Sequence, residues 1–276
     1  MCHDEIISTL RRLADPGVAR TNRRFFKCGP GQYGEGDVFW GIRVPALRRL
    51  AREHRECQLE VVARLLDSPV HEQRLLGLVM LSDRYERSNR ARRAAVYDFY
   101  WQRIDRVNNW DLVDLSAPAI LGRHLAEAAP RGRALAVLDG LARSGNLWRR
   151  RIAIVATLAM TRRDWFEPTL RIARRLLDNP EDLIHKATGW MLRELGKREP
   201  AALEAFLSAH AARMPRTMLR YAIERLPAAA RRGWLAAGKA GAGGMDAGKP
   251  AARRGESQKT PRKPRKSKKL TRRSAA

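Results

Sequence analysis

A helix start of distinctive composition lies at Asn109-Trp110-Asp111-Leu112-Val113-Asp114-Leu115-Ser116-Ala117, where a polar and aromatic turn leads into small and apolar positions. Four other stretches repeat this pattern and can be superposed on it, namely residues 69–77, 147–153, 180–188 and 215–222. Each of the five stretches carries one marked residue at the equivalent position. The marked residues are Arg74, Asp114, Arg151, Lys186 and Arg220.

The marked residues are 40, 37, 35 and 34 positions apart, which is the size of a unit of two helices. From residue 5 to about residue 235, apolar residues recur at intervals of three and four residues, as on one face of a helix. The alternation of apolar and polar residues that is typical of a strand is essentially missing. We therefore predict an all-α, HEAT-like helical repeat solenoid. Equivalent positions on its inner helices would line one concave face, and four of the five marked residues make that face basic.

The charge of the chain indicates an anionic polymer as partner. It has 55 Lys and Arg against 29 Asp and Glu, a net charge of +26. Residues 239–276 hold 13 basic and two acidic side chains, so +15 remains on residues 1–238. Nucleic acid is the first expectation, and an anionic membrane is the second.

Two segments depart from the helical rhythm. Residues 27–37 contain four Gly and one Pro, so we predict a loop, without the ending of a nucleotide-binding phosphate loop. The chain after residue 238 is rich in Gly and Ala and then in Lys and Arg, which is typical of disorder. We predict a repeat domain at 1–237 and a disordered basic tail at 238–276.

Cysteine and histidine give no sign of a metal site. The three Cys form no CxxC pair, and the six His form no HExxH motif, so we expect no metal and no cofactor. The odd Cys count fits a reducing compartment. The acidic start and the lack of a long apolar run predict a cytoplasmic protein with no membrane span, associated with the nucleoid if the source is bacterial.

Aromatic residues gather around the marked positions. Trp110 lies four residues before Asp114, Trp148 three before Arg151, and Trp190 four after Lys186. Indole faces attract a cationic base, and a single carboxylate can stabilise positive charge on a sugar or position a water. Core packing is an equal alternative for Trp148. Asp111 is an early-turn residue favoured by the helix dipole, with a direct catalytic role as the less favoured alternative.

The stretches 109–114, 147–153 and 186–194 resemble the AlkD-like DNA alkylation repair family, and the resemblance extends over about residues 1–235. It implies a HEAT-like DNA glycosylase that removes cationic purines such as 3-methyladenine and 7-methylguanine from duplex DNA without base flipping. By the family's motifs, Trp110 and Trp190 would contact the lesion nucleotide, Asp114 would stabilise the oxocarbenium ion and the water, and Arg151 would hold phosphate.

Further candidates for DNA contact belong to the same motifs and marked positions: Arg74, Trp148, Arg150, Lys186, Arg193 and Arg220. The N-terminal segment departs from the family, and either Phe26 or Tyr33 could supply its DNA-touching aromatic ring. We expect a monomer. We also expect a monofunctional enzyme, because the motifs offer no candidate lysine nucleophile for Schiff-base lyase chemistry. Two alternatives stay open, a noncatalytic binder of unusual DNA structures and a protein-interaction solenoid.

Overall fold

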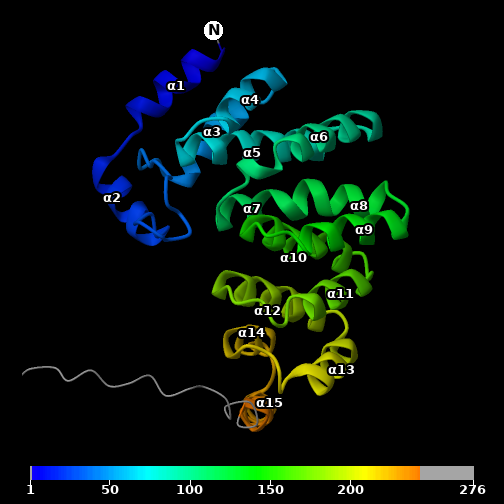
Figure 1. Cartoon of the computed structure of the whole chain (residues 1–276). Helices are drawn as coiled ribbons and strands as arrows, with labels where there is room; N and C mark the ends of the chain where they lie inside the picture. Colours follow the sequence, from blue (N-terminus) through cyan, green and yellow to red (C-terminus); the bar gives the residue numbers. More distant parts are fainter. Residues whose placement is uncertain (1, 243–276) are drawn as a thin grey trace, which may run out of the picture.

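The computed structural model describes residues 2–242, which form one helix after another without a strand (Figure 1). The N-terminal helices are α1 (Cys2–Arg12), α2 (Pro16–Phe25), α3 (Val44–Glu53), α4 (Leu59–Leu66), α5 (His71–Arg87) and α6 (Arg90–Gln102). The central helices are η1 (Ile104–Arg106), α7 (Trp110–Ser116), η2 (Ala117–Gly122), α8 (Arg123–Glu127), α9 (Arg131–Ala142), α10 (Leu147–Thr161) and α11 (Glu167–Arg175). The last are α12 (Asp182–Gly196), α13 (Pro200–His210), α14 (Arg216–Ala222) and α15 (Ala228–Ala242).

Five inner helices follow one another along the stack, α5, α7, α10, α12 and α14, and each contacts the next (Figure 1). Outer helices pack against them, so that α5 contacts α6, α10 contacts α9 and α11, and α12 contacts α13. This arrangement confirms the predicted all-α helical repeat fold. Each marked residue lies within the first two turns of its inner helix, which explains why the pattern could be superposed.

The centre of the stack is α10, whose residues from Arg151 to Thr161 are all buried. Residues 152–160 are apolar on every side of the helix apart from Thr157, which fits a helix surrounded by α7, η2, α9, α11 and α12. Two glycines permit close approach of neighbouring backbones. A Cβ on Gly122 would stand 2.1 Å from the carbonyl oxygen of Ala156, and one on Gly189 would stand 2.4 Å from that of Met218. The positions of η2 and α12 therefore depend on these glycines.

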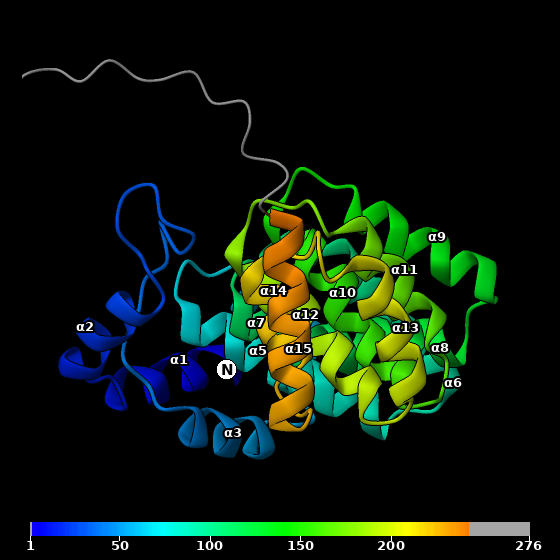
Figure 2. The same cartoon turned by 90° about the horizontal axis from the view of Figure 1, so that it is seen from below.

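The predicted loop at residues 27–37 is confirmed, since no helix forms between α2 and α3. Lys27, Gly31 and Gly36 adopt positive φ angles of 49°, 70° and 86°. Gly34 lies so close to the backbone that a Cβ would stand 2.2 Å from the carbonyl oxygen of Phe26. The loop and α2 lie on the same side of the stack (Figure 2). Glycine thus lets the chain fold back tightly beside the inner helices.

The last helix, α15, continues past residue 237 to Ala242, and the predicted division into a repeat domain and a tail stays a prediction. The rest of the predicted tail lies outside the described residues. Among the helices described, none has both the length and the apolar character needed to cross a membrane.

Candidate functional site

Asp114 and Arg151 form a two-pronged ion pair between α7 and α10. Nε and one terminal nitrogen of Arg151 donate to the two carboxylate oxygens at 2.9 and 2.8 Å, and the other terminal nitrogen donates to the carbonyl of Leu183 at 2.5 Å. Arg151 is 5% exposed, whereas the Asp114 side chain is 21% exposed. Burial raises the pKa of Asp114, and the Arg151 charge opposes that rise. Arg151 therefore fixes the orientation of a carboxylate that still reaches the surface.

A groove of about 750 Å³ brings together Trp110, Asp114 and Trp190. We call it the Asp114 groove. Apolar residues of α7, η2 and α10 also line the groove, and the remaining lining residues are charged. The charged residues are Arg48, Glu86, Asp111, Arg123, Arg162 and Arg163. Two tryptophans, a fixed carboxylate and four arginines therefore share one concave site.

The four arginines of the groove were not among the sequence candidates, because they lie outside the marked positions. Arg48 belongs to α3, Arg123 begins α8, and Arg162 and Arg163 follow the end of α10. Arg123 and Arg163 form ion pairs with Glu127, and Arg123 also pairs with Glu86. The Arg162-Arg163 pair, which closely follows the largely apolar run at residues 152–160, was a signal that could have indicated two of them.

Asparagine caps explain how the two tryptophan-bearing helix starts form. The side chain of Asn146 accepts hydrogen bonds from the backbone amides of Trp148 at 2.8 Å and Arg149 at 3.2 Å, which begins α10. The side chain of Asn109 accepts from the backbone amide of Trp110 at 2.8 Å and begins α7 in a similar way. These caps present each indole at the first turn of an inner helix.

The aromatic surroundings distinguish the two N-terminal candidates. The ring of Phe26 stacks on Trp110 with centroids 5.2 Å apart, and Phe26 is only 8% exposed. Tyr33 is half-buried and meets Trp148 edge-on at 6.1 Å. Burial raises the pKa of Tyr33, although a hydrogen bond with Trp110 and the charges of Lys186 and Arg151 oppose the rise. Tyr33 is therefore the ring that remains partly open beside the groove.

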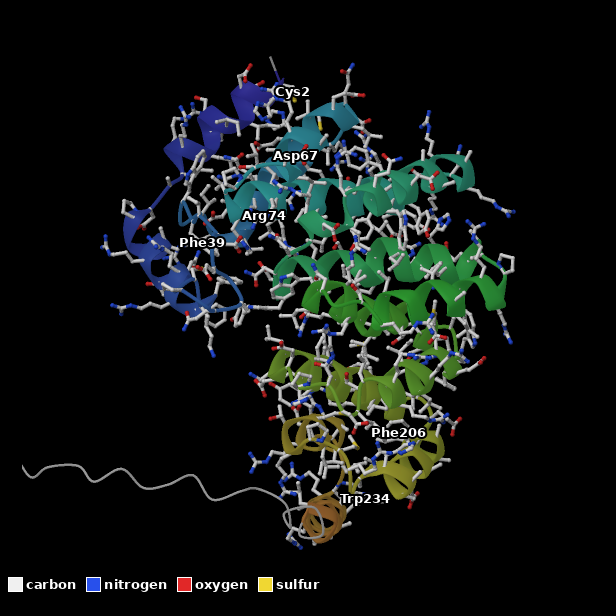
Figure 3. All side chains as sticks on the ribbon, in the orientation of Figure 1. Cys2, Phe39, Asp67, Arg74, Phe206 and Trp234 are labelled. Carbon is white, nitrogen blue, oxygen red and sulfur yellow. The ribbon has the colours of Figure 1, made fainter. Side chains whose placement is uncertain are left out.

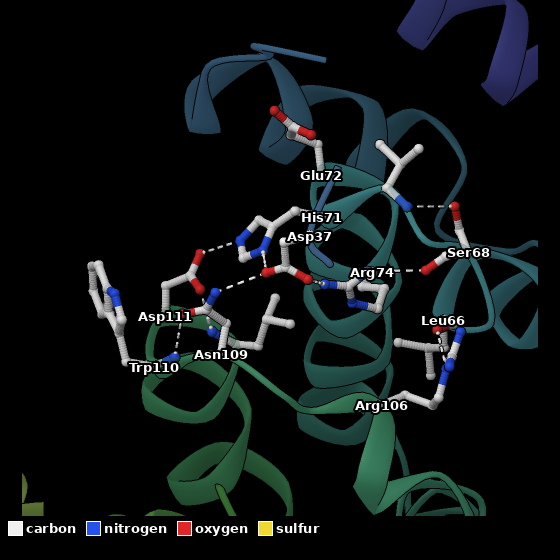
Figure 4. A network of polar contacts seen from close by, with 12 residues as sticks. Asp37, Leu66, Ser68, His71, Glu72, Arg74, Arg106, Asn109, Trp110 and Asp111 are labelled. Atoms are coloured by element: carbon white, nitrogen blue, oxygen red, sulfur yellow. Dashed lines mark hydrogen bonds and ion pairs between the residues drawn. The ribbon is translucent and has the colours of Figure 1, made fainter. Parts of the chain in front are cut away.

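A buried polar network joins the loop to α5 and α7 (Figure 4). One oxygen of Asp37 accepts from Nδ1 of His71 at 3.1 Å and from the side chain of Asn109 at 2.8 Å. Nε2 of His71 lies 2.8 Å from a carboxylate oxygen of Asp111. Burial alone would lower the pKa of His71, but the two carboxylates raise it to about 9. His71 is thus an imidazolium held between Asp37 and Asp111.

Sequence reasoning missed this network, since it considered the histidines only as possible metal ligands. The side chain of His71 is 2% exposed, and its ring stacks on Phe39 with centroids 4.6 Å apart. The partners Asp37 and Asp111 are 34 and 40 residues away in the sequence. No spacing rule for local motifs reaches over such separations, so only the fold could show the cluster.

Arg74 requires a correction, because it does not lie on an exposed basic face. It is 3% exposed inside the N-terminal part of the stack (Figure 3). Its guanidinium forms an ion pair with Asp37 and donates to the carbonyl oxygen of Ser68 at 3.0 Å. A buried charge needs such partners to offset its loss of hydration, and these partners take up the hydrogen-bond donors of the Arg74 guanidinium. In this structure Arg74 holds the loop in place and does not reach the Asp114 groove.

The other DNA-contact candidates lie apart from the ion pair of Asp114. Lys186 is 42% exposed and pairs with Asp182 at 2.7 Å, while Arg220 is exposed on α14. Arg193 pairs with Glu224, and Arg150 donates to the carbonyl oxygens of Ser144 and Gly145, both at 2.9 Å. Lys186 and Arg220 are thus the marked basic residues that keep substantial exposure. Their predicted contact with DNA stays a prediction.

In the part of the chain that the structure describes, no group of three or more His, Cys, Asp or Glu side chains is arranged to hold a metal ion.

Comparison with known proteins gives a family and a fold. No protein with a curated description matches the chain significantly. A solved structure described as a predicted DNA alkylation repair enzyme from Enterococcus faecalis is 18% identical, with a TM-score of 0.58, and the match covers 78% of this chain and 97% of that one. The structure of smu.31 from Streptococcus mutans UA159 is 14% identical, with a TM-score of 0.44, covering 86% and 98%.

The family comparison covers the whole repeat array up to α14. Residues 6–226 match the family described as "DNA alkylation repair enzyme", a span that includes Trp110, Asp114, Arg151 and Trp190. The match confirms the family expected from the helix-start motifs. The chain belongs to the DNA alkylation repair enzyme family.

Proposed function

We propose that this protein is a DNA glycosylase that hydrolyses the N-glycosidic bond of cationic alkylated purines, such as 3-methyladenine and 7-methylguanine, in duplex DNA. The observation that carries the proposal is the carboxylate of Asp114, fixed by Arg151 and flanked by Trp110 and Trp190 in one groove. Family membership supports a role in DNA repair, and the reaction itself is inferred from this geometry.

The chemistry suits a base that is already positively charged. When the bond between C1′ and the base nitrogen breaks, its electron pair leaves with the base, which becomes neutral. Positive charge then develops on the sugar, where an ionised Asp114 stabilises it. A water adds to C1′ and gives its proton to Asp114, which leaves an abasic site and a free base. No acid is needed to protonate the leaving group.

The rest of the groove supports substrate binding. Indole faces attract a cationic base or a cationic sugar, and Trp110 and Trp190 both line the groove. Exposed Arg48 and Arg162 would contact phosphates, together with Lys186 and Arg220 farther along the inner helices. The site is an open groove and not an enclosed pocket, which fits a base that stays within the duplex, so the proposal includes no base flipping for excision. We propose that one protein molecule acts alone.

Base release from methylated duplex DNA by wild-type protein and by Asp114→Asn tests the proposal. We expect 7-methylguanine release to fall by about 100-fold or more, because one electrostatic group at a reacting centre contributes on that order. DNA binding should persist. Asp105→Asn is the matched control, since Asp105 forms a similar two-pronged pair with Arg149, at 2.7 Å for each contact, outside the groove. Equal release by wild type and Asp114→Asn would rule out the mechanism.

A noncatalytic DNA binder is the second candidate, and the same ion pair favours it. Arg151 occupies both oxygens of Asp114, so part of the charge that would stabilise an oxocarbenium ion is already compensated. The base-release assay separates the two candidates, because a binder retains methylated DNA without generating abasic sites.

A further inference from the structure

A second cleft, of about 860 Å³, adjoins the Asp114 groove, and Trp110 and Asp111 line both. We call it the Phe25 cleft. Its lining comes from α2, from the linker at residues 39–43 and from the first turns of α3, α5 and α7. It therefore opens beside the proposed catalytic groove and shares α3, α5 and α7 with it, whereas α2 lines only the cleft.

The lining of the Phe25 cleft is mainly apolar and aromatic. Phe25, Phe26 and Phe39 all contribute, and the rings of Phe26 and Phe39 stack at 5.0 Å. Phe25 is 62% exposed and meets Trp110 edge-on at 5.7 Å. An exposed phenyl ring on so basic a protein offers a face for stacking. Nucleic acid bases stack on aromatic side chains of this kind without strict sequence preference.

The lining of the cleft includes the carboxylates of Glu72 and Asp111, and one of them can accept a further hydrogen bond. The carboxylate of Glu72 is occupied, because it accepts from the backbone amides of Trp40, Gly41 and Ile42. The carboxylate of Asp111 accepts from His71 and from one backbone amide, and its side chain is 18% exposed. A carboxylate has about four acceptor positions, so Asp111 can accept from an exocyclic amine.

The rim of the cleft is basic. Arg43 lines the opening and is exposed. Arg20 is exposed as well, and both arginines lie close enough to Asp15, another lining residue, to act on it electrostatically. Positive charge at the rim and aromatic faces within match the two halves of a nucleotide, its phosphate and its base.

We propose that the Phe25 cleft takes one unpaired nucleobase carrying an exocyclic amine from DNA bound along the Asp114 groove. The base stacks on the exposed Phe25 ring and donates its amine to Asp111, while the flanking phosphates lie at Arg20 and Arg43. This proposal rests on the DNA binding contained in the proposed function, and base excision is not required for it.

The test compares affinities, by fluorescence anisotropy, for a fully paired short duplex and for the same duplex with one unpaired cytosine. We expect wild-type protein to prefer the unpaired cytosine by about tenfold, the size of one base stacked on one ring. Phe25→Ala should lose that preference and keep its affinity for the paired duplex. Trp101→Ala is the control, because Trp101 is 39% exposed on α6 and lines neither cleft.

Three results of the affinity measurements would overturn the proposal. They are equal wild-type affinity for the two duplexes, an equal loss for both in Phe25→Ala, and the same preference for an unpaired thymine, which has no exocyclic amine. A Phe25-dependent dimer in sedimentation velocity would overturn it too, by assigning the cleft to a second copy. Base release measured on the same protein samples reports separately on the proposed function. Loss of release with retained preference for cytosine would leave the cleft assignment intact.

Discussion

Nε2 of His71 lies 2.8 Å from the carboxylate of Asp111, the residue next to Trp110. On its other side, Nδ1 of the same ring lies 3.1 Å from Asp37. One buried imidazolium therefore joins the glycine-rich loop to the helix start that carries the proposed catalytic tryptophan. The positive charge of His71 compensates the carboxylates of Asp37 and Asp111, and all three side chains have little contact with solvent.

Replacement of His71 by Gln should remove a pH-dependent part of the stability. The pKa of His71 is about 9 in the folded protein and 6.5 when unperturbed. Because folding raises it, its stabilisation is complete below about pH 6.5 and is lost as the pH rises through about 9. The full effect is on the order of 3 kcal/mol. Urea unfolding of both proteins across this pH range measures it.

His210→Gln is the control for this prediction. His210 packs against Phe206. Burial is the main cause that lowers the pKa of His210, and the charges of Arg174 and Arg213 lower it further. Its replacement should leave the stability loss between about pH 6.5 and 9 unchanged. A His71→Gln protein with the same pH dependence as wild type would show that His71 is not charged.

Arg151→Ala should move the acidic limb of the base-release rate to higher pH. Burial raises the pKa of Asp114, and the guanidinium of Arg151 opposes that rise. Without the guanidinium the carboxylate should protonate at higher pH, and only its ionised form stabilises the sugar cation. Single-turnover rates measured across the acidic range give the midpoint. Arg151→Lys should restore part of the shift, and an unmoved midpoint would exclude Asp114 as the titrating group.

Arg220→Ala should weaken binding to duplex DNA at every sequence and lower the slope of log affinity against log salt by about 1. Arg220 is exposed on α14 and so can reach a phosphate. Arg74→Gln should leave that slope unchanged while lowering the thermal midpoint, since Arg74 is buried against Asp37. Salt titrations of both variants separate the two roles, and a reduced slope in Arg74→Gln would contradict its structural assignment.

Gly122→Ala should destabilise the protein by about 1–3 kcal/mol, the usual cost of overpacking a dense interior. The added Cβ would stand 2.1 Å from the carbonyl oxygen of Ala156, so η2 would have to move away from α10. Gly140→Ala is the matched control in α9, because nothing lies within 4 Å of its Cβ position. That change should stabilise by about 0.5–1 kcal/mol. Denaturant unfolding checks both, and equal effects would refute the packing argument.

The sequence predicted the repeat because each inner helix begins in the same way. The marked residues recur at the period of a helix pair, and the polar, small and apolar positions around each of them are a local property. Trp110 and Asp114 line the same groove because they lie four residues apart on one helix, and this spacing can be seen in the sequence. Trp190 lies four residues after its marked residue, whereas Trp110 lies four before its own, so their meeting in one groove depends on how α7, α10 and α12 pack.

The exposure of the marked residues could not be predicted in the same way. Arg74 and Arg151 occupy equivalent positions to Lys186 and Arg220, yet both are buried by carboxylates from other units. Asp37, which covers Arg74, comes from a loop that has no counterpart in the repeat. Periodicity shows which positions share a face, but the partner that reaches each position depends on contacts over long sequence distances.

The contacts of Asp37 also affect the order in which the helical repeats unfold. In a simple solenoid each unit contacts only its neighbours, so the terminal units can open one at a time. Here a single carboxylate contacts Arg74 and His71 of α5 and Asn109 at the start of α7. Opening the N-terminal segment would leave buried charges without partners in two successive units. Loss of structure should therefore begin at the α14–α15 end, and hydrogen exchange there should be fastest.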